Sequence, residues 1–549
     1  MRQSSVQGPG AQRRASGAET TERGGGPRRD GAGPGDLPGQ RQGGRHQGGG
    51  PPAPGGKHRV LRWVSTTLAV LILGTAGAGY LYYEHLNGNL DKDDLNLGDN
   101  KLDKSAPNAA GQTPLNILLL GSDSRKSKEN VKLGGARADR DRPALADVQM
   151  LLHVSADRSN MSVISVPRDT RVTIPRCTDK KDSDKVYPET SDTINSSLAH
   201  GGPGCTVATW EELTGIPIDH FMMIDFSGVV DMADAVGGVP VCVDNNVYDA
   251  KSGLRLKKGD STIKGVQALQ WLRTRHGFED GSDIGRAKAQ HLYMNSMVRQ
   301  LKAGTKLTDP DKLTDLAEAA TKALTVDDGL GTVKKLYDLG NDLKRVPTKR
   351  ITMATMPWVP DAQNPAHVIP KPGDADKTFS LMRNDVGLDG KDKKKHGPKK
   401  KPVPSDPAAP KGEIPVAVQN GTGTAAQIAV RGRAATIAGQ LTRLGFSQAA
   451  TDATPKSRAD TTVSYPKADQ RGDAQAVAKA LGLPDSAVRP AAEVSQVTLV
   501  IGADWRTGTE YPKSAGSEKH GDEKAPDSAD ALKGDDKSAC MKVNPANVW

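Results

Sequence analysis

The 549-residue chain is poor in cysteine and in aromatic residues. Its four cysteines form no C-x-x-C pair, which argues against a zinc ribbon. Phenylalanine, tyrosine and tryptophan make up 4% of the residues, whereas glycine (60) and proline (36) are abundant, and this composition predicts disordered stretches around folded domains. The net charge of +10 permits nucleic acid, anionic lipid or phosphate-bearing partners and does not choose among them.

One long hydrophobic run stands out near the N-terminus. The uncharged stretch Trp63–Tyr83 is long enough to cross a bilayer core, and aromatic residues mark both of its ends. Basic residues precede it and Glu84 follows it, so the positive-inside rule predicts a single-pass signal-anchor in the cell membrane, with a cytoplasmic N-terminus and the remaining chain outside the cell. A cleaved signal peptide is the weaker alternative because no clear A-x-A site follows, and a buried soluble helix is another.

Composition divides the chain into seven segments. The first is a basic, low-complexity cytoplasmic tail without a helix-turn-helix pattern, so no nucleic-acid partner is expected. The predicted order is disordered tail (1–59), transmembrane helix (60–83), polar stalk (84–112), large domain (113–385), basic proline-rich linker (386–412), small domain (413–505) and disordered charged tail (506–549).

Both domains alternate short apolar runs with segments of helical periodicity. In the large domain the expected strands are 115–121, 148–156, 161–167, 218–225 and 239–243, and the expected helices are 206–215, 226–238, 263–275 and 284–301. This order predicts an α/β fold with a mixed central sheet flanked by helices. The small domain alternates three strands with two helices, the first helix at 426–446, and is predicted to be a small α/β module.

Charged residues recur at the ends of these apolar strands. Asp123 follows the first strand, Asp147 precedes the second and Arg168 follows the third, and strand ends are where ligand crevices form in α/β sheets. Further residues close one helix and begin the next: Arg273, Arg275, Asp283, Arg286 and Gln290. Arginines that converge with carboxylates predict a pyrophosphate site that includes a divalent ion such as Mg²⁺. Surface ion pairs are the alternative for each residue taken singly.

The cysteines fit an oxidising environment. Cys177 and Cys205 both fall in a loop-rich stretch, and an extracellular location would allow them to pair, so a Cys177–Cys205 disulfide is predicted. Cys242 lies in an apolar strand and is expected to stay a buried thiol. The alternative is that all four cysteines, Cys540 in the tail included, remain reduced.

Seven segments of the large domain resemble the LytR-CpsA-Psr family, in the family's order. They are NILLLGSDSR (116–125), ADVQMLLHV (146–154), VPRDT (166–170), INSSLAHGGPG (194–204), TGIPIDHFMMIDFSGVVDMADAVGGVPV (214–241), GVQALQWLRTRH (265–276) and DGSDIGRAKAQ (280–290). The small domain, which opens IPVAVQNGTG and closes VTLVIGADW, resembles the LytR C-terminal module found on many such proteins.

The resemblance implies a transferase of cell wall biogenesis. Such enzymes move a teichoic acid-like glycopolymer from a polyprenyl-pyrophosphate carrier onto peptidoglycan and make a phosphodiester. By motif, catalysis and pyrophosphate binding would fall to Arg168, Arg273, Arg275, Arg286 and Gln290, the ligands of Mg²⁺ (or Mn²⁺) would be Asp123 and Asp147, and Asp283 would have an acid–base or metal-supporting role. A non-enzymatic lipid-carrier-binding regulator of the transcription-attenuator type and a polyprenyl-pyrophosphate hydrolase are the alternatives.

Three features depart from the family pattern. Ala289 stands where an arginine is frequent, and Thr193 stands where a lysine is frequent. A charged insertion at 126–145 separates Asp123 from Asp147, and its Asp139 and Asp141 could compete as metal ligands. Each departure weakens one expected phosphate or metal contact and leaves the main arginine cluster in place.

Overall fold

The computed structural model describes most of the chain after residue 56. The described residues are 57–99, 102, 104–105, 107–108, 110–125, 127–134, 142–179, 182, 184–304, 310–392, 407–423, 429–454, 458, 461–483, 487–491, 494–512 and 524–549. The tail expected to be disordered therefore lies almost entirely outside them, as do Asp139 and Asp141. The chain divides into two compact units, Met1–Leu73 and Gly74–Trp549.

Helix α1 (Lys57–Asn89) contains the apolar run near the N-terminus. Within Arg59–Asn89 the most apolar window has a mean hydropathy of 1.6, and none of that window is buried. Among the described residues, α1 is the one helix whose length and composition suit a membrane span. This long apolar helix is consistent with the membrane anchor that the sequence predicts.

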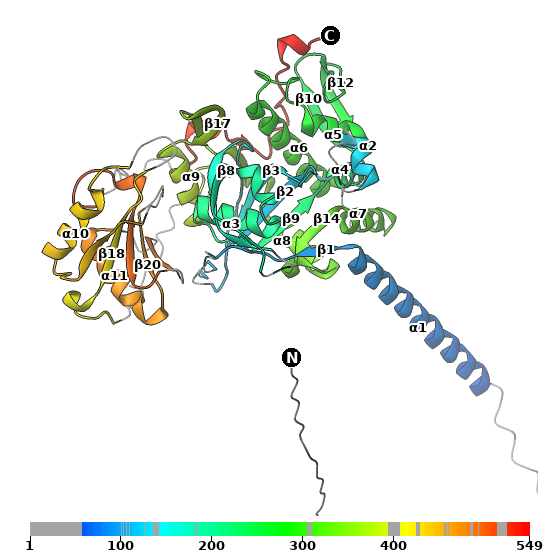
Figure 1. The fold of residues 1–549 in the computed structure, drawn as a ribbon. Helices are drawn as coiled ribbons and strands as arrows, with labels where there is room; N and C mark the ends of the chain where they lie inside the picture. Colours follow the sequence, from blue (N-terminus) through cyan, green and yellow to red (C-terminus); the bar gives the residue numbers. More distant parts are fainter. Residues whose placement is uncertain are drawn as a thin grey trace, which may run out of the picture. The chain divides into compact units, whose positions relative to one another are not determined.

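A mixed eight-stranded sheet forms the centre of the large domain, as predicted. Its strand order is β1–β14–β9–β2–β3–β4–β15–β23. Figure 1 labels five of these strands, β1, β14, β9, β2 and β3. Strand β2 pairs antiparallel with β3 and parallel with β9, and β4 pairs antiparallel with β3 and parallel with β15. The strands are β1 (Asp91–Asp93), β2 (Leu115–Ser122), β3 (Ala146–Val154), β4 (Met161–Ser165), β9 (His220–Ile224), β14 (Leu324–Asp327), β15 (Ile351–Thr355) and β23 (Leu532–Lys533).

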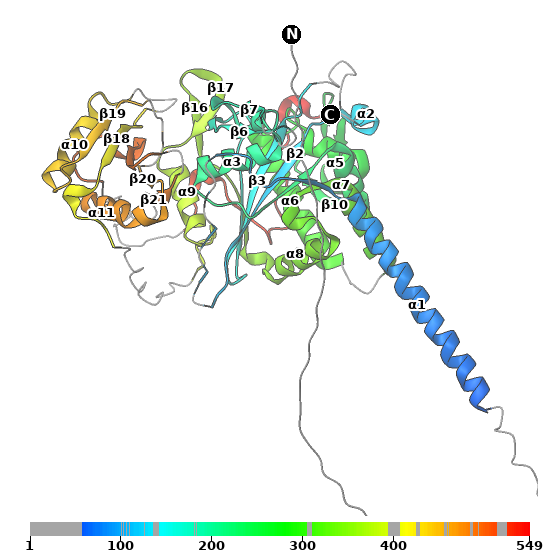
Figure 2. The ribbon, with the colours of Figure 1, turned by 60° about the horizontal axis from the view of Figure 1, so that its bottom comes forward.

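Apolar side chains alternate between the two faces of this sheet. Along β2, Leu118 belongs to the core on one face and Ile117 to the core on the other. Figure 2 shows helices on both sides of the central strands. The first face packs against α3 (Pro203–Thr214) and α9 (Asp374–Arg383), and the second packs against α6 (Asp283–Gly304) and α8 (Val333–Arg345).

Further helices and two-stranded ribbons complete the large domain. The helices are α2 (Lys128–Gly134), α4 (Phe226–Ala235), α5 (Gly265–Arg273) and α7 (Pro310–Ala323). The two-stranded ribbons are β5 (Arg171–Ile174) with β8 (Thr190–Thr193), β6 (Cys177–Thr178) with β7 (Val186–Tyr187), β10 (Val239–Val243) with β13 (Gly259–Ile263), β11 (Val247–Asp249) with β12 (Leu254–Leu256), and β16 (Trp358–Asp361) with β17 (Asn364–Pro370). The strand expected at 239–243 thus forms, but it pairs outside the central sheet.

The small domain is a five-stranded mixed sheet with two helices. Its strands, in sheet order, are β19 (Ala449–Asp452), β18 (Val416–Asn420), β22 (Val497–Ile501), β20 (Thr462–Tyr465) and β21 (Val488–Pro490), and its helices are α10 (Arg433–Arg443) and α11 (Arg471–Leu481). The predicted start of the first helix, at residue 426, lies outside the described residues, and the prediction is wrong over residues 429–432, which are not helical. Gly432 adopts φ +75°, a left-handed conformation that a helix interior cannot contain, so the helix begins at Arg433.

The polar stalk is shorter than the sequence predicts. Helix α1 continues to Asn89, and β1 then pairs in parallel with β14 at the edge of the central sheet. Leu86 and Leu90 are buried. These two leucines anchor the segment because burying their apolar surface outweighs the polarity of the residues around them.

The C-terminal tail is not disordered over residues 524–549. This part adds β23 to the edge of β15, and its Met541 and Val543 enter an apolar core with Trp271 and Phe278. A disulfide joins Cys540 to Cys242, so the expectation that Cys242 is a thiol is wrong. The charged composition predicted disorder, but a few apolar residues and one cysteine are enough to attach a charged segment to an existing core.

The first disulfide joins the pair that the sequence singles out. The sulfur atoms of Cys177 and Cys205 lie 2.02 Å apart, with both residues fully buried. The bond links β6 to the first turn of α3. No free cysteine is present among the described residues.

Candidate active site

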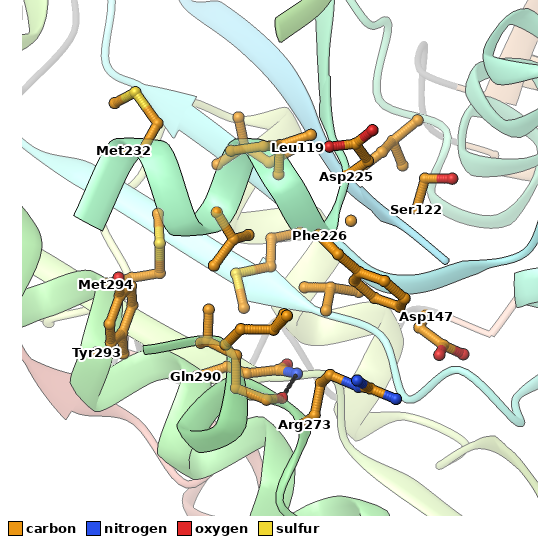
Figure 3. Close-up of a pocket in the computed structure, with 18 of the residues that line it drawn as sticks. Leu119, Ser122, Asp147, Asp225, Phe226, Met232, Arg273, Gln290, Tyr293 and Met294 are labelled. Carbon is orange, nitrogen blue, oxygen red and sulfur yellow. Dashed lines mark hydrogen bonds between the residues drawn. The ribbon is translucent and has the colours of Figure 1, made fainter. Parts of the chain in front are cut away.

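A cavity of about 280 Å³ lies between the central sheet and helices α4, α5 and α6. Its walls are mostly apolar and rich in methionine. In Figure 3, Met232, Met294 and Tyr293 lie toward one end, and Arg273, Asp147 and Ser122 lie toward the other. The cavity is therefore amphipathic along its length, with an apolar interior and a charged mouth.

Arg168 is the centre of the charged cluster beside this mouth. Its Nη1 donates to Oδ1 of Asp147 at 2.7 Å, and its Nε donates to Oδ2 of Asp283 at 2.8 Å. The Nε atom also lies 3.4 Å from Oδ1 of Asp169. Because β3 and β4 are antiparallel, β3 starts where β4 ends, at the same end of the strands. This pairing brings Asp147 and Arg168 together.

Asp283, the first residue of α6, gathers two further arginines. Nε of Arg275 lies 3.0 Å from its Oδ1, and Nη2 of Arg286 lies 3.5 Å from its Oδ2. Arg286 is buried, with a side chain that is 8% exposed, and its Nη2 also donates to the backbone oxygen of Asp147 at 3.4 Å. Three predicted arginines, Arg168, Arg275 and Arg286, thus converge on one carboxylate.

The two carboxyl groups Asp169 and Asp283 differ in their affinity for a proton. Burial raises the pKa of Asp283, but the charges of Arg286, Arg168 and Arg275 outweigh burial and hold it below its usual value. Burial and a hydrogen bond to Asp283 instead raise the pKa of Asp169. Asp283 therefore stays ionised, and Asp169 is the carboxyl group of the pair that takes up a proton more readily.

Arg168 and Arg286 show opposite effects of the same surroundings. Burial acts to lower the pKa of Arg168, but the carboxylates of Asp147 and Asp283 raise it above its usual value. For Arg286 burial prevails and lowers the pKa. An arginine remains protonated throughout the physiological range, so both side chains present full positive charge at the cavity mouth.

Arg273 and Gln290 are held by backbone oxygens. Arg273 donates to the carbonyls of Leu133 and Gly134 in α2, at 2.9 and 3.1 Å, and its guanidinium lies 4.7 Å from the ring centroid of Phe226. Gln290 donates to the carbonyl of Leu272 at 3.1 Å. Both line the cavity, but the structure does not place them in the ion-pair cluster around Asp283.

Asp123 lies at the same sheet edge as Asp147 but has its own partners. Its backbone N–H donates to Leu145, and its carboxylate accepts from the Leu145 N–H at 2.7 Å and pairs with Arg142. The described residues contain no group of three or more metal-ligating side chains. Mg²⁺ commonly takes one or two protein carboxylates and completes its shell with phosphate and water, so Asp123 and Asp147 are the side chains at this end of the sheet that could contribute to such a site.

Ala289 explains one departure from the family pattern. Its side chain is completely buried, and its backbone oxygen accepts a hydrogen bond from Nε1 of Trp271 at 2.9 Å. An arginine at this position would have to leave the apolar core or displace Trp271. In this chain the position therefore contributes a small buried side chain to the apolar core, and it supplies no charge to the site.

Three residues that contact the predicted site residues are absent from the sequence prediction. Asp169 was not assigned a role, although it directly follows Arg168 in the VPRDT segment, and that adjacency was the available signal. Arg142, which pairs with Asp123, lies 19 positions further along the chain, and Phe226, which packs against the guanidinium of Arg273, lies in α4. No local pattern points to either of them.

Comparison with known proteins agrees with the motifs. The profile of the LytR_cpsA_psr family matches residues 80–381, and that of the module described as LytR cell envelope-related transcriptional attenuator matches residues 413–505. The chain belongs to the LytR_cpsA_psr family. The resemblance predicted from the sequence motifs is thereby confirmed.

Two curated relatives and one solved structure illustrate the likeness. Cell wall biosynthesis protein LcpA of Corynebacterium glutamicum is 31% identical over 320 residues, which are 55% of this chain and 60% of LcpA. The polyisoprenyl-teichoic acid–peptidoglycan teichoic acid transferase TagU of Bacillus anthracis is 28% identical over 290 residues, 51% of this chain and 84% of TagU. The LytR-Csp2A-Psr enzyme from Actinomyces oris matches 53% of this chain and 95% of its own, with 20% identity and a TM-score of 0.40.

Proposed function

We propose that this LytR_cpsA_psr protein is a phosphotransferase that moves a glycopolymer from a polyprenyl-pyrophosphate carrier onto peptidoglycan and forms a phosphodiester. One observation carries the proposal: an apolar cavity opens directly beside a cluster of convergent arginines. A polyprenyl pyrophosphate has the complementary polarity, an apolar chain attached to a polyanionic head. The names of TagU and LcpA support the same reaction class and its place in cell wall assembly.

In this proposal the arginines bind and orient the pyrophosphate. Arg168, Arg275 and Arg286 would exchange part of their pairing with Asp283 and Asp147 for contacts to phosphate oxygens. Arg273 and Gln290 line the route from the apolar interior to this cluster. Phosphoryl transfer depends mainly on such positioning and charge stabilisation.

A divalent ion completes the proposed site. Asp123 and Asp147 would hold Mg²⁺ (or Mn²⁺), and the bound ion would neutralise charge that develops on the pyrophosphate. The pairing of Asp123 with Arg142 and of Asp147 with Arg168 implies that metal affinity is low until the pyrophosphate supplies further oxygens.

The Asp169–Asp283 pair suits proton transfer from the acceptor hydroxyl. Asp283 is held ionised by its arginines, whereas burial raises the pKa of Asp169. We assign to Asp283 the role of orienting the arginines. We assign to Asp169 the role of taking up the proton that the acceptor hydroxyl loses. The acceptor would be a hydroxyl of peptidoglycan, since TagU is named for transfer onto that polymer.

The proposed location is the cell membrane. Helix α1 would span it once, with the N-terminus in the cytoplasm and both domains outside, because Arg59 and Arg62 lie at the N-terminal end of the apolar run and Glu84 follows it. Extracellular placement also suits two disulfides, which form in oxidising compartments.

The decisive experiment incubates the purified full chain with labelled lipid-linked glycopolymer and peptidoglycan. Covalent label in peptidoglycan supports the transferase. Release of free polymer phosphate would identify a hydrolase instead, and retention of intact lipid-linked polymer on the protein would identify a non-enzymatic binder. When arginines of the cluster are substituted in this assay, Arg176→Ala is the matched control, because Arg176 forms an exposed ion pair away from the cluster.

A further inference from the structure

The loop between α5 and α6 carries the chemistry of the proposed site on both of its ends. Arg273 ends α5, Arg275 lies in the loop, and Asp283 begins α6. Within the loop, Glu279 adopts φ +50°, a conformation that non-glycine residues keep only where their surroundings fix it. The position of Arg275 relative to Asp283 therefore depends on what holds residues 274–282.

The C-terminal segment, residues 524–549, supplies that support. The N–H of Asn544 donates to the carbonyl of Gly277 at 3.0 Å, the N–H of Glu279 donates to the carbonyl of Lys542 at 2.9 Å, and the side-chain amide of Asn547 donates to the carbonyl of His276 at 2.8 Å. The strained Glu279 is thus directly tied to the segment.

The segment itself is anchored directly before and between these contacts. Cys540 is disulfide-bonded to Cys242 in β10, and Met541 exchanges backbone hydrogen bonds with Cys242 and Asp244. Val543 is buried beside Phe278, which belongs to the loop. Figure 1 shows the C-terminal residues, in red, beside β10 and β12.

We propose that the C-terminal segment is a positioning element of the active site: it fixes the α5–α6 loop so that Arg275 and Asp283 lie in register for the pyrophosphate. The inference rests on the proposed function. It assigns part of the active-site geometry to a segment that lies outside residues 80–381, which match the family. The residues of the segment touch the loop and not the reacting atoms, so they act through Arg275 and Asp283.

Asn544 offers a test that separates backbone support from side-chain effects. Its φ of −64° is a value that proline adopts, so Asn544→Pro suits the local backbone. The substitution removes the N–H donor to Gly277, and the proline ring takes the space of that hydrogen bond, so the loop has to move away from residue 544. Asn544→Ala keeps the N–H and removes only the side-chain cap on Ala546. The two variants share the loss of the cap and differ in the hydrogen bond to the loop.

The expected result is a fall in kcat of about 10- to 100-fold for Asn544→Pro, with KM for a synthetic polyprenyl-pyrophosphate disaccharide and the Tm close to those of Asn544→Ala, because small misplacements of catalytic groups cost this much. Amide hydrogen exchange of residues 274–282 should rise in Asn544→Pro and stay unchanged in Asn544→Ala. A chain with both Cys242→Ser and Cys540→Ser should show a smaller rise in exchange over the same residues.

Equal kcat and equal exchange in the two Asn544 variants would overturn the positioning role. If the unmodified chain transfers no glycopolymer, the proposed function fails, and the exchange measurement still decides whether the segment fixes the loop. A low Tm in Asn544→Pro would shift the decision to the two cysteine substitutions, where unchanged exchange and unchanged kcat together would overturn the proposal.

Discussion

Nη1 of Arg168 lies 2.7 Å from Oδ1 of Asp147, and this contact joins the end of β4 to the start of β3 at the mouth of the apolar cavity. The sequence places these residues 21 positions apart, and the antiparallel pairing of the strands brings them together. The contact makes two residues with different proposed partners, a phosphate and a metal ion, parts of a single cluster.

Arg168→Ala should reduce transfer by about 10²- to 10³-fold while the fold survives, since each contact to transition-state charge has roughly this effect. Arg168→Lys should recover little activity because a single ammonium cannot reach both Asp147 and Asp283 as the guanidinium does. Transfer assays and circular dichroism check both statements, with Arg176→Ala as the control. Near-normal transfer by the folded Ala variant would remove Arg168 from the site.

Asp147→Asn should abolish the coupling between Mg²⁺ and substrate. In the unmodified chain, calorimetry should show that Mg²⁺ binds weakly alone and much more tightly when geranyl pyrophosphate is present, because the ion needs phosphate oxygens to complete its shell. Asp123→Asn should show the same loss. If Asp139→Asn loses the coupling and Asp123→Asn does not, the first ligand is Asp139, and activity in excess chelator would exclude the metal role.

His291 should make the fold sensitive to acid. It is fully buried in α6, and burial lowers its pKa to about 4 from an ordinary value of 6.5. The folded state favours the neutral ring. The contribution of His291 to the free energy of unfolding is therefore complete above pH 6.5 and is lost as the pH falls toward 4. The loss approaches roughly 3 kcal/mol, at about 1.4 kcal/mol per pKa unit.

Denaturant unfolding between pH 7 and 4 measures this effect. His291→Leu should flatten the pH dependence, whereas His367→Ala in β17 should leave it unchanged. The same slope in the unmodified chain and in His291→Leu would show that carboxylates, and not His291, govern the acid response.

Cys177→Ser combined with Cys205→Ser should lower the free energy of unfolding by about 3 kcal/mol. The disulfide spans 28 residues, and a loop of this length restricts the unfolded chain by that order. Chemical denaturation of the two forms gives the difference. Mass spectrometry of non-reduced peptides provides the control, since both cysteines should resist alkylation until a reductant is added.

A reporter fused after Trp549 should be active outside the cell, and one inserted near residue 30 should be active inside. The reason is the excess of basic residues before the apolar run of α1. Protease added to intact protoplasts should remove the small domain. Its protection would reverse the proposed orientation.

Local pattern predicted much of the fold and left the pairing undetermined. The runs that became β2, β3, β4 and β9 are short, apolar and bounded by turn residues, so each strand was visible in the sequence. The partner of β10 was not visible, because an apolar run does not say which sheet receives it. Gly432 shows the same limit in a helix, since periodicity continued across a residue whose backbone conformation ends it.

The site divides in the same way. Arg168, Arg275 and Arg286 lie in short motifs at element ends, and those motifs carried their prediction. Arg142 and Phe226 reach Asp123 and Arg273 only through the folded chain, so neither contact has a local signal. The burial of Ala289 likewise follows from its packing beneath Trp271 and not from its neighbours in sequence.

The disulfide between Cys242 and Cys540 closes a covalent ring, since it joins two residues that are 298 positions apart in the sequence. The small domain lies within this ring, so in covalent terms it is an insertion, tied at both of its ends to the large domain. One backbone cut between residues 393 and 523 would therefore open the ring without releasing a fragment. On a gel, such a nicked chain would migrate near full length until the disulfide is reduced, and only then separate into two pieces.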